Sequence, residues 1–240
     1  MSVNRKIRTF AGLRVALGLA LLISAASSQT MAAEIAFKPV APGVFAFIGE
    51  TEGRTYENEG LNANIGLVET NTGAVLIDSG ASFQGARQIA EAAAKVTKQP
   101  IRWVINTGGQ DHRWLGNGYF KAQGAEIMAH ADAEADMKAR GNEHLRENAP
   151  VLKEKMSGTE LVLPTRWFKD ADSKLDLGGV LVQVVHRNGG HTPGDSMVWL
   201  PQSGVVFTGD VVYVDRILGL HPVSKTKTWV QSFEALEALK

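Results

Sequence analysis

The pattern that most constrains the fold is a strand, a helix and a second strand in direct succession. Residues 74–77 form a short apolar run, residues 84–97 are rich in Ala with apolar side chains at helical spacing, and residues 101–105 are apolar again. A helix between two such runs predicts a crossover that places both strands in one sheet. The chain is therefore expected to be an α/β protein.

Further elements are expected on both sides of this unit. Apolar runs bounded by turn residues predict short strands at residues 44–48, 64–69, 126–129, 161–163, 174–177, 180–186, 196–200 and 205–208. Helical segments are predicted at residues 131–156 and 228–240, and the polar residues 51–61, with two glycines, are predicted to form a mobile loop. No composition shift marks a linker, so a single folded domain is expected.

The first 33 residues have the composition of a secretory signal peptide. Basic residues precede an apolar run at residues 15–26, which is too short to cross a bilayer, and Ala32 or Ala33 can stand before a cleavage site. We therefore expect a signal peptide at residues 1–33, a mature domain at residues 34–240, a periplasmic location and no stable membrane insertion after the signal is removed. An uncleaved anchor or a buried helix is the alternative.

Charge and cysteine content exclude several classes of function. Lys and Arg together number 25, as do Asp and Glu, so nothing favours a nucleic-acid partner, and a small-molecule substrate is expected instead. Cysteine is absent, which excludes disulfides, thiolate zinc ligands and a cysteine nucleophile. A metal ion would have to be held by His, Asp, Glu, Asn or Gln side chains, or by the backbone.

Polar residues with metal-binding chemistry follow several of the predicted strands. Asp111 and His112 follow residues 101–105, His191 stands in the turn Gly-Gly-His-Thr-Pro-Gly-Asp, and Asp210 follows residues 205–208. Asp78 ends another strand in the same way. Strand ends are where side chains converge on a cleft in α/β folds. Taken singly, each of these residues is equally consistent with a helix cap or a turn.

In their order, these segments resemble the metallo-β-lactamase superfamily over residues 34–240. The resemblance implies an αββα four-layer sandwich with a one- or two-zinc site at one edge of its sheets. In that superfamily the metal activates water for attack on an ester, thioester, amide or lactam carbonyl. The resemblance carries over onto four residues as metal ligands: Asp111, His112, His191 and Asp210. Asp78 matches a position that supports the site from outside.

The match to the family's His-x-His-x-Asp-His motif is partial. Both leading His are missing, because residues 108–110 read Gly-Gly-Gln. Pairing Asp111 with the family's Asp assumes a one-residue gap; without it, His112 falls on the family's Asp and Arg113 on its final His. The expected C-terminal His is missing too, so a fold without its last strand and helix is predicted, either as a fragment or as a naturally shorter protein.

The sequence thus predicts a metal-dependent hydrolase with a reduced, mononuclear zinc site, acting on an ester, thioester or amide-type bond. Asp111 is the predicted catalytic residue, and a second zinc ion is not supported by the ligand count. The alternative is a catalytically inactive binding or accessory protein on the same fold. Neither the substrate nor the oligomeric state is predicted.

Overall fold

The computed structural model describes residues 34–239, so the signal peptide predicted at residues 1–33 lies outside the described residues. The strands are β1 (Lys38–Ala41), β2 (Val44–Phe47), β3 (Ile65–Glu69), β4 (Ala74–Ile77), β5 (Ile101–Asn106), β6 (Glu126–His130), β7 (Arg166–Phe168), β8 (Asp172–Leu177), β9 (Val180–His186), β10 (Ser196–Leu200) and β11 (Val205–Phe207). The helices are α1 (Phe83–Val96), α2 (Asp111–Trp114), α3 (Asn117–Ala122), α4 (Ala133–Leu152), α5 (Thr226–Glu237) and the short 3₁₀ helices η1 (Lys153–Met156) and η2 (Gly209–Val211). No helix among these residues is both long and apolar enough to span a bilayer.

The strands form two sheets, one with seven strands in the order β1 to β7 and one with four in the order β11-β10-β9-β8. The first sheet is antiparallel from β1 to β4 and parallel from β4 to β7. The predicted crossover is confirmed, because α1 connects β4 to the parallel strand β5. The N-terminus of α1 is capped by Ser82, whose Oγ accepts the N–H of Gly85 at 2.9 Å.

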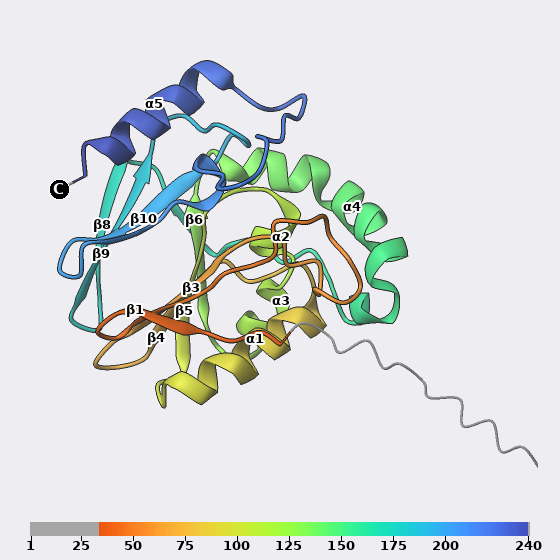
Figure 1. The fold of residues 1–240 in the computed structure, drawn as a ribbon, viewed down its shortest axis with the longest axis horizontal. Helices are drawn as coiled ribbons and strands as arrows, with labels where there is room; N and C mark the ends of the chain where they lie inside the picture. Colours follow the sequence, from red (N-terminus) through yellow and green to blue (C-terminus); the bar gives the residue numbers. More distant parts are fainter. Residues whose placement is uncertain (1–33, 240) are drawn as a thin grey trace, which may run out of the picture. The chain divides into compact units, whose positions relative to one another are not determined.

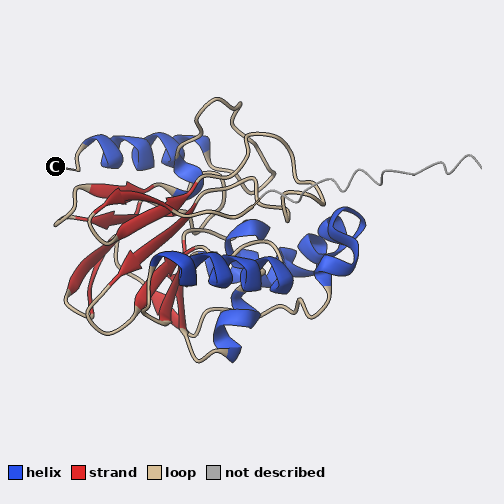
Figure 2. Ribbon diagram, turned by 60° about the horizontal axis from the view of Figure 1, so that its bottom comes forward, coloured by secondary structure: helices blue, strands red, loops and turns tan. Residues whose placement is uncertain are grey.

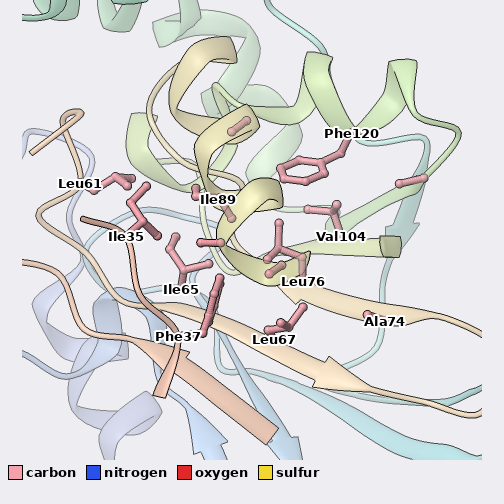
Figure 3. Close-up of a cluster of buried hydrophobic side chains, with 14 of the residues drawn as sticks. Ile35, Phe37, Leu61, Ile65, Leu67, Ala74, Leu76, Ile89, Val104 and Phe120 are labelled. Atoms are coloured by element: carbon pink, nitrogen blue, oxygen red, sulfur yellow. The ribbon is translucent and has the colours of Figure 1, made fainter. Parts of the chain in front are cut away.

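Helices cover the outer face of each sheet, which gives the predicted four layers. Figure 2 shows the strands between helices on two sides, and in Figure 1 α5 lies along the four-stranded sheet. The inner core joins side chains of both sheets, such as Val75 and Ile105 from one and Val184 and Val198 from the other. A second core, drawn in Figure 3, packs Ile89 of α1 and other helix residues against the outer face of the seven-stranded sheet.

One predicted strand is absent, and the predicted loop at residues 51–61 contacts the core. Residues 161–163 form no strand; Leu161 and Leu163 instead pack as an apolar loop beside Trp114, and the strand that joins the sheet is β7. The segment at residues 51–61 is polar but not free of the core, because Leu61 is buried and the Glu59 carboxylate, also buried, accepts a hydrogen bond from Lys155. Periodicity alone could not show either packing partner.

Candidate functional site

Four segments far apart in the sequence meet at one edge of the two sheets. Asp78 follows β4, and Asp111 begins α2 after the parallel neighbour β5. From the second sheet, the turn between β9 and β10 carries His191, and η2 after β11 carries Asp210. The carboxyl ends of β4 and β5 lie together because the two strands are parallel.

Arg113 lies between two buried carboxylates. Its Nε donates to Asp210 Oδ2 at 3.0 Å, its Nη2 donates to Asp210 Oδ1 at 2.5 Å, and its Nη1 donates to Asp78 Oδ2 at 2.9 Å. The exposed fraction of the Arg113 side chain is 5%. A two-point contact between guanidinium and carboxylate is the strong form of an ion pair. The chain thus places a cation of its own against Asp210.

The surroundings shift the pKa of these two carboxyls in opposite directions. Burial raises the pKa of Asp78, although Arg113 and the hydrogen bonds from Thr107 lower it. Burial acts on Asp210 as well, but Arg113 and His112 outweigh it and hold the pKa of Asp210 well below its usual range. The groups that contact Asp78 are all donors, which suits the carboxylate form.

Asp111 is fully buried and already bonded on both oxygens. Oδ1 accepts hydrogen bonds from Arg54 Nη2 and, at 2.8 Å, from the His112 N–H, and Oδ2 accepts one from Asn148 of α4 at 2.6 Å. Burial opposes ionisation of this carboxyl, but the contacts with His112, Arg54 and Asn148 outweigh it and lower the pKa of Asp111. Asp111 is therefore an ionised carboxylate whose lone pairs are largely engaged.

The two His side chains each present one unengaged ring nitrogen. His112 Nδ1 lies 3.3 Å from Asp111 Oδ1, whereas its Nε2 is buried, has no hydrogen-bond partner within residues 34–239 and lies 3.6 Å from Asp210 Oδ2. His191 Nδ1 bonds to the Gly219 carbonyl at 2.9 Å, so it donates there and Nε2 is the nitrogen with the free lone pair. Burial lowers the pKa of His191 and favours the neutral ring.

The space beside the first motif is filled in a way that leaves no room for a side chain at position 108. A Cβ added to Gly108 would lie 2.5 Å from Asp195 Oδ1. Burial, followed by the charge of Asp210, raises the pKa of Asp195 to about 8, so this carboxyl is protonated at neutral pH. Asp195 is held by Thr192, whose N–H donates to Oδ2 at 2.8 Å. A His at position 108 would require Asp195 to move.

A cavity of about 420 Å³ opens beside Asp210. Asp78, Arg113 and Asp210 contribute to its lining, together with Phe207 and Tyr213. His112 and His191 are not among its lining residues. Asp210 is thus the residue that the cavity shares with the His pair.

A different group of side chains is close enough to share an ion. Within residues 34–239, one set of three His and Asp side chains has ligand atoms that all lie within 4.8 Å of one another: His130, Asp132 and His186. This group could hold a metal ion. The sequence did not single it out, because His186 reads as an ordinary polar end of β9 and Asp132 as part of a polar helix.

Buried His144 of α4 gives a test of the electrostatics around Asp111. Burial lowers the pKa of His144 from its ordinary value of 6.5 to about 4, and neither ring nitrogen has a hydrogen-bond partner in the part of the chain that the structure describes. The unfolded chain therefore takes up this proton before the folded chain does, and stability is lost as pH falls from about 6.5 towards 4.

We expect His144→Leu to remove this loss. Between pH 7 and pH 4.5, urea unfolding should show the variant gaining about 2 kcal/mol relative to the parent protein. The matched control is His221→Leu, the same change at an exposed position, where no buried imidazole is removed. If the stability of His144→Leu and that of the parent protein fall in parallel with pH, the lowered pKa of His144 is contradicted.

Comparison with known proteins identifies the family. Residues 58–240 match the sequence profile described as the metallo-beta-lactamase superfamily. The chain belongs to this superfamily. The predicted membership is confirmed, and at this level the protein is hydrolase-like.

One relative in sequence and two solved structures are similar to this chain. The human acyl-coenzyme A thioesterase MBLAC2 is 28% identical over 221 residues, which cover 84% of this chain and 75% of the relative. A metallo-beta-lactamase from Pontibacter korlensis superimposes with a TM-score of 0.64 at 21% identity, covering 84% of each chain. The alkylsulfatase Pisa1 from Pseudomonas sp. gives a TM-score of 0.66 at 19% identity over 85% of this chain and 36% of that one. The two structures show a shared fold.

The geometry bears on the two registers left open for the superfamily's first motif. His112 and Arg113 are the residues of this segment that contact Asp210, whereas Asp111 is bonded to Arg54 and Asn148. In the register without a gap, these two residues fall on the superfamily's Asp and final His.

Proposed function

We propose that this chain hydrolyses an ester, thioester or amide-type bond with one zinc ion held by His112, His191 and Asp210. The observation that carries the proposal is the buried, unpartnered Nε2 of His112, 3.6 Å from Asp210 Oδ2. A buried polar atom without a partner is unusual in a native protein and calls for an explanation such as an ion. Imidazole nitrogen and carboxylate oxygen are donors that zinc accepts, so the residues fit the metal in kind.

His191 supports the proposal through the bond at its far nitrogen. A His that binds zinc usually donates its other ring N–H to a carbonyl or carboxylate, as His191 does to Gly219. The ligand atoms of the three proposed residues do not form a group within 4.8 Å among the described residues. Ion uptake therefore requires the His191 ring to approach Asp210 and His112.

Asp111 and Arg113 take supporting roles in this proposal. Asp111, predicted as a ligand, lies 3.3 Å from Nδ1 of His112 and bonds to its N–H, whereas the Nε2 that would bind the ion faces Asp210, so we propose that Asp111 positions His112. Arg113 occupies Asp210 on both oxygens and reaches Asp78, so its charge stands where a second ion would need to bind. The guanidinium supports a one-ion site over a two-ion site because like charges repel at this distance.

The remaining residues suggest how substrate is handled. A zinc ion here would supply a Lewis acid and lower the pKa of water towards neutrality. Tyr213 lines the cavity, and burial together with Asp210 raises its pKa, so its O–H stays available as a donor to a substrate oxygen. Asp210 connects the cavity to the His pair, which would keep a carbonyl bound in the cavity close to the reacting water.

Thioester hydrolysis by the purified full chain tests this proposal. Because the human relative MBLAC2 is an acyl-coenzyme A thioesterase, an acyl-coenzyme A is the first substrate to try. Free thiol can be followed with a thiol reagent without protein background, because the chain has no cysteine. We expect turnover that a chelator abolishes and added zinc restores. If a chelator leaves turnover unchanged, the proposed zinc site is wrong. If no ester, thioester or lactam substrate is hydrolysed, the proposed hydrolase activity is wrong.

A second candidate is favoured by the Arg113 ion pairs. Two buried carboxylates that are already neutralised by the chain's own guanidinium do not require a metal. The same fold would then serve as a catalytically inactive binding or accessory protein, with the cavity beside Asp210 as its ligand site. Metal-free binding of an acyl thioester with no turnover would favour this candidate.

We also propose that the mature chain works in the periplasm. The support is the basic and apolar composition of residues 1–33, which is typical of a secretory signal. Release of a chain beginning near Glu34 by osmotic shock would agree with this location. Retention of the full-length chain in the cytoplasm would contradict it.

A further inference from the structure

The group of His130, Asp132 and His186, called the His130 cluster below, lies where the two sheets meet. His130 is the last residue of β6 in the seven-stranded sheet, and Asp132 stands directly before α4. His186 is the last residue of β9 in the four-stranded sheet. An ion shared by these side chains would connect the two sheets.

The contacts of His186 require a cation between it and Asp132. Nδ1 of His186 lies 2.8 Å from the Asp195 carbonyl oxygen, which can only accept, so Nδ1 carries a proton. Nε2 lies 3.1 Å from Asp132 Oδ2, which as a carboxylate oxygen also accepts. A neutral ring has one N–H, so its Nε2 lone pair would face a carboxylate. Either a second proton or a metal ion must lie between them.

His130 supplies a second imidazole beside this pair. Its ring stacks on that of His186, with centroids 3.6 Å apart and planes inclined by 17°. Nδ1 lies 4.0 Å from Asp132 Oδ2 and accepts a hydrogen bond from the Asp132 N–H at 3.3 Å, which the ion would replace, and Nε2 is buried without a hydrogen-bond partner among the described residues.

Exposure and charge suit an ion that enters from solvent. Both His are about 5% exposed, whereas Asp132 is 52% exposed and opens the cluster to water. Asp170 adds negative charge near His130. The lone pairs of near-parallel rings do not converge on one point, so one ring has to tilt as the ion binds.

We propose that His130, Asp132 and His186 bind one divalent transition-metal ion of the zinc class. Two imidazoles and a carboxylate form a ligand set that zinc, cobalt and nickel accept, with water completing the coordination. The ion would brace the turn that carries His191, because His186 bonds to Asp195 and Asp195 accepts the Thr192 N–H at 2.8 Å. The inference does not depend on zinc at His112.

The experiment uses the full chain with His112→Gln and His191→Gln, so that the site proposed for catalysis is disabled. The metal-free protein is titrated with Co²⁺ at pH 7.5 and followed by absorption of the bound ion, and with Zn²⁺ by calorimetry. We expect one equivalent to bind. Adding His186→Gln or Asp132→Asn should weaken binding at least tenfold, whereas Asp172→Asn, a change of another partly exposed carboxylate, should not.

Thermal unfolding keeps the test independent of variants that fail to fold. Asp132 is half exposed, so Asp132→Asn is expected to fold as the background does. Zinc at a hundredfold excess over its Kd should raise the Tm of the background by about 5 °C or more, and that of Asp132→Asn by about half as much or less. No bound ion, or binding that His186→Gln and Asp132→Asn both leave intact, would overturn the proposal. If no ion binds, a proton lies between His186 and Asp132, and the two side chains form an ion pair.

Discussion

Replacing Arg113 with Met is expected to lower the free energy of unfolding by about 3–5 kcal/mol. Arg113 is buried, and its guanidinium makes all three hydrogen bonds that join it to Asp78 and Asp210. Met fills a similar volume but leaves two buried carboxylates without their cation. Removing one partner of a buried pair costs much more than the pair itself contributes, because an uncompensated charge stays in a medium of low polarity.

The control for Arg113 is an exposed ion pair on the same protein. Arg87 and Glu91 lie one helical turn apart on α1 at 3.7 Å, with Arg87 54% exposed. Arg87→Met should therefore change stability by less than about 0.5 kcal/mol. The double variant Arg113→Met/Asp210→Asn should lose less than the sum of the two single changes, since each residue loses the same partner. Equal losses of stability for Arg113→Met and Arg87→Met in urea unfolding would contradict the role given to the buried ion pairs of Arg113 with Asp78 and Asp210.

His112→Gln is expected to lower kcat/KM for thioester hydrolysis at least a hundredfold, about 3 kcal/mol of transition-state stabilisation. Gln keeps a polar side chain of similar length, but it has no ring nitrogen to place beside Asp210. The loss should fall mainly on kcat, because His112 does not line the cavity that we propose as the substrate site. Stability should change much less than activity, which unfolding measurements on the same variant can show.

His221→Gln is the matched control for this loss. The His221 ring lies 4.8 Å from that of His191 but is exposed to solvent, and no role in the reaction is assigned to it. We expect its kcat/KM to stay within about threefold of the parent value, a difference of less than about 1 kcal/mol. If both variants lose activity equally, the loss reflects the general surroundings of His191 and the role of His112 is wrong.

The sequence predicted the fold and the segments that meet at the site, because both rest on local patterns. The crossover around α1 follows from apolar spacing, and the order of the motifs at Asp111, His191 and Asp210 follows a known family. Strand ends then bring these motifs to one edge without further information. Periodicity failed where a tertiary partner decides the structure, as for Leu161 and Leu163 beside Trp114.

The contacts within the site could not be predicted in the same way. Asp111 and Arg113 are two residues apart, and the turn into α2 decides which of them faces Asp210. The ion pairs of Arg113 also involve Asp78, which stands 35 residues before it in the sequence. The His130 cluster joins two sheets through residues 54 positions apart, a distance at which no spacing rule applies. Long-range pairing of this kind is set by the packing of whole layers.

The most direct measurement is the zinc content of the purified full chain beside that of the Asp111→Ala/His112→Ala variant. Both proteins are loaded with zinc, passed through a desalting column and analysed by elemental methods, with circular dichroism as the check on folding. One equivalent fewer in the variant is predicted, because His112 is removed as a ligand and Asp111 no longer positions it. Equal zinc in the two folded proteins, or less than about a tenth of an equivalent in both, would contradict a zinc site at His112.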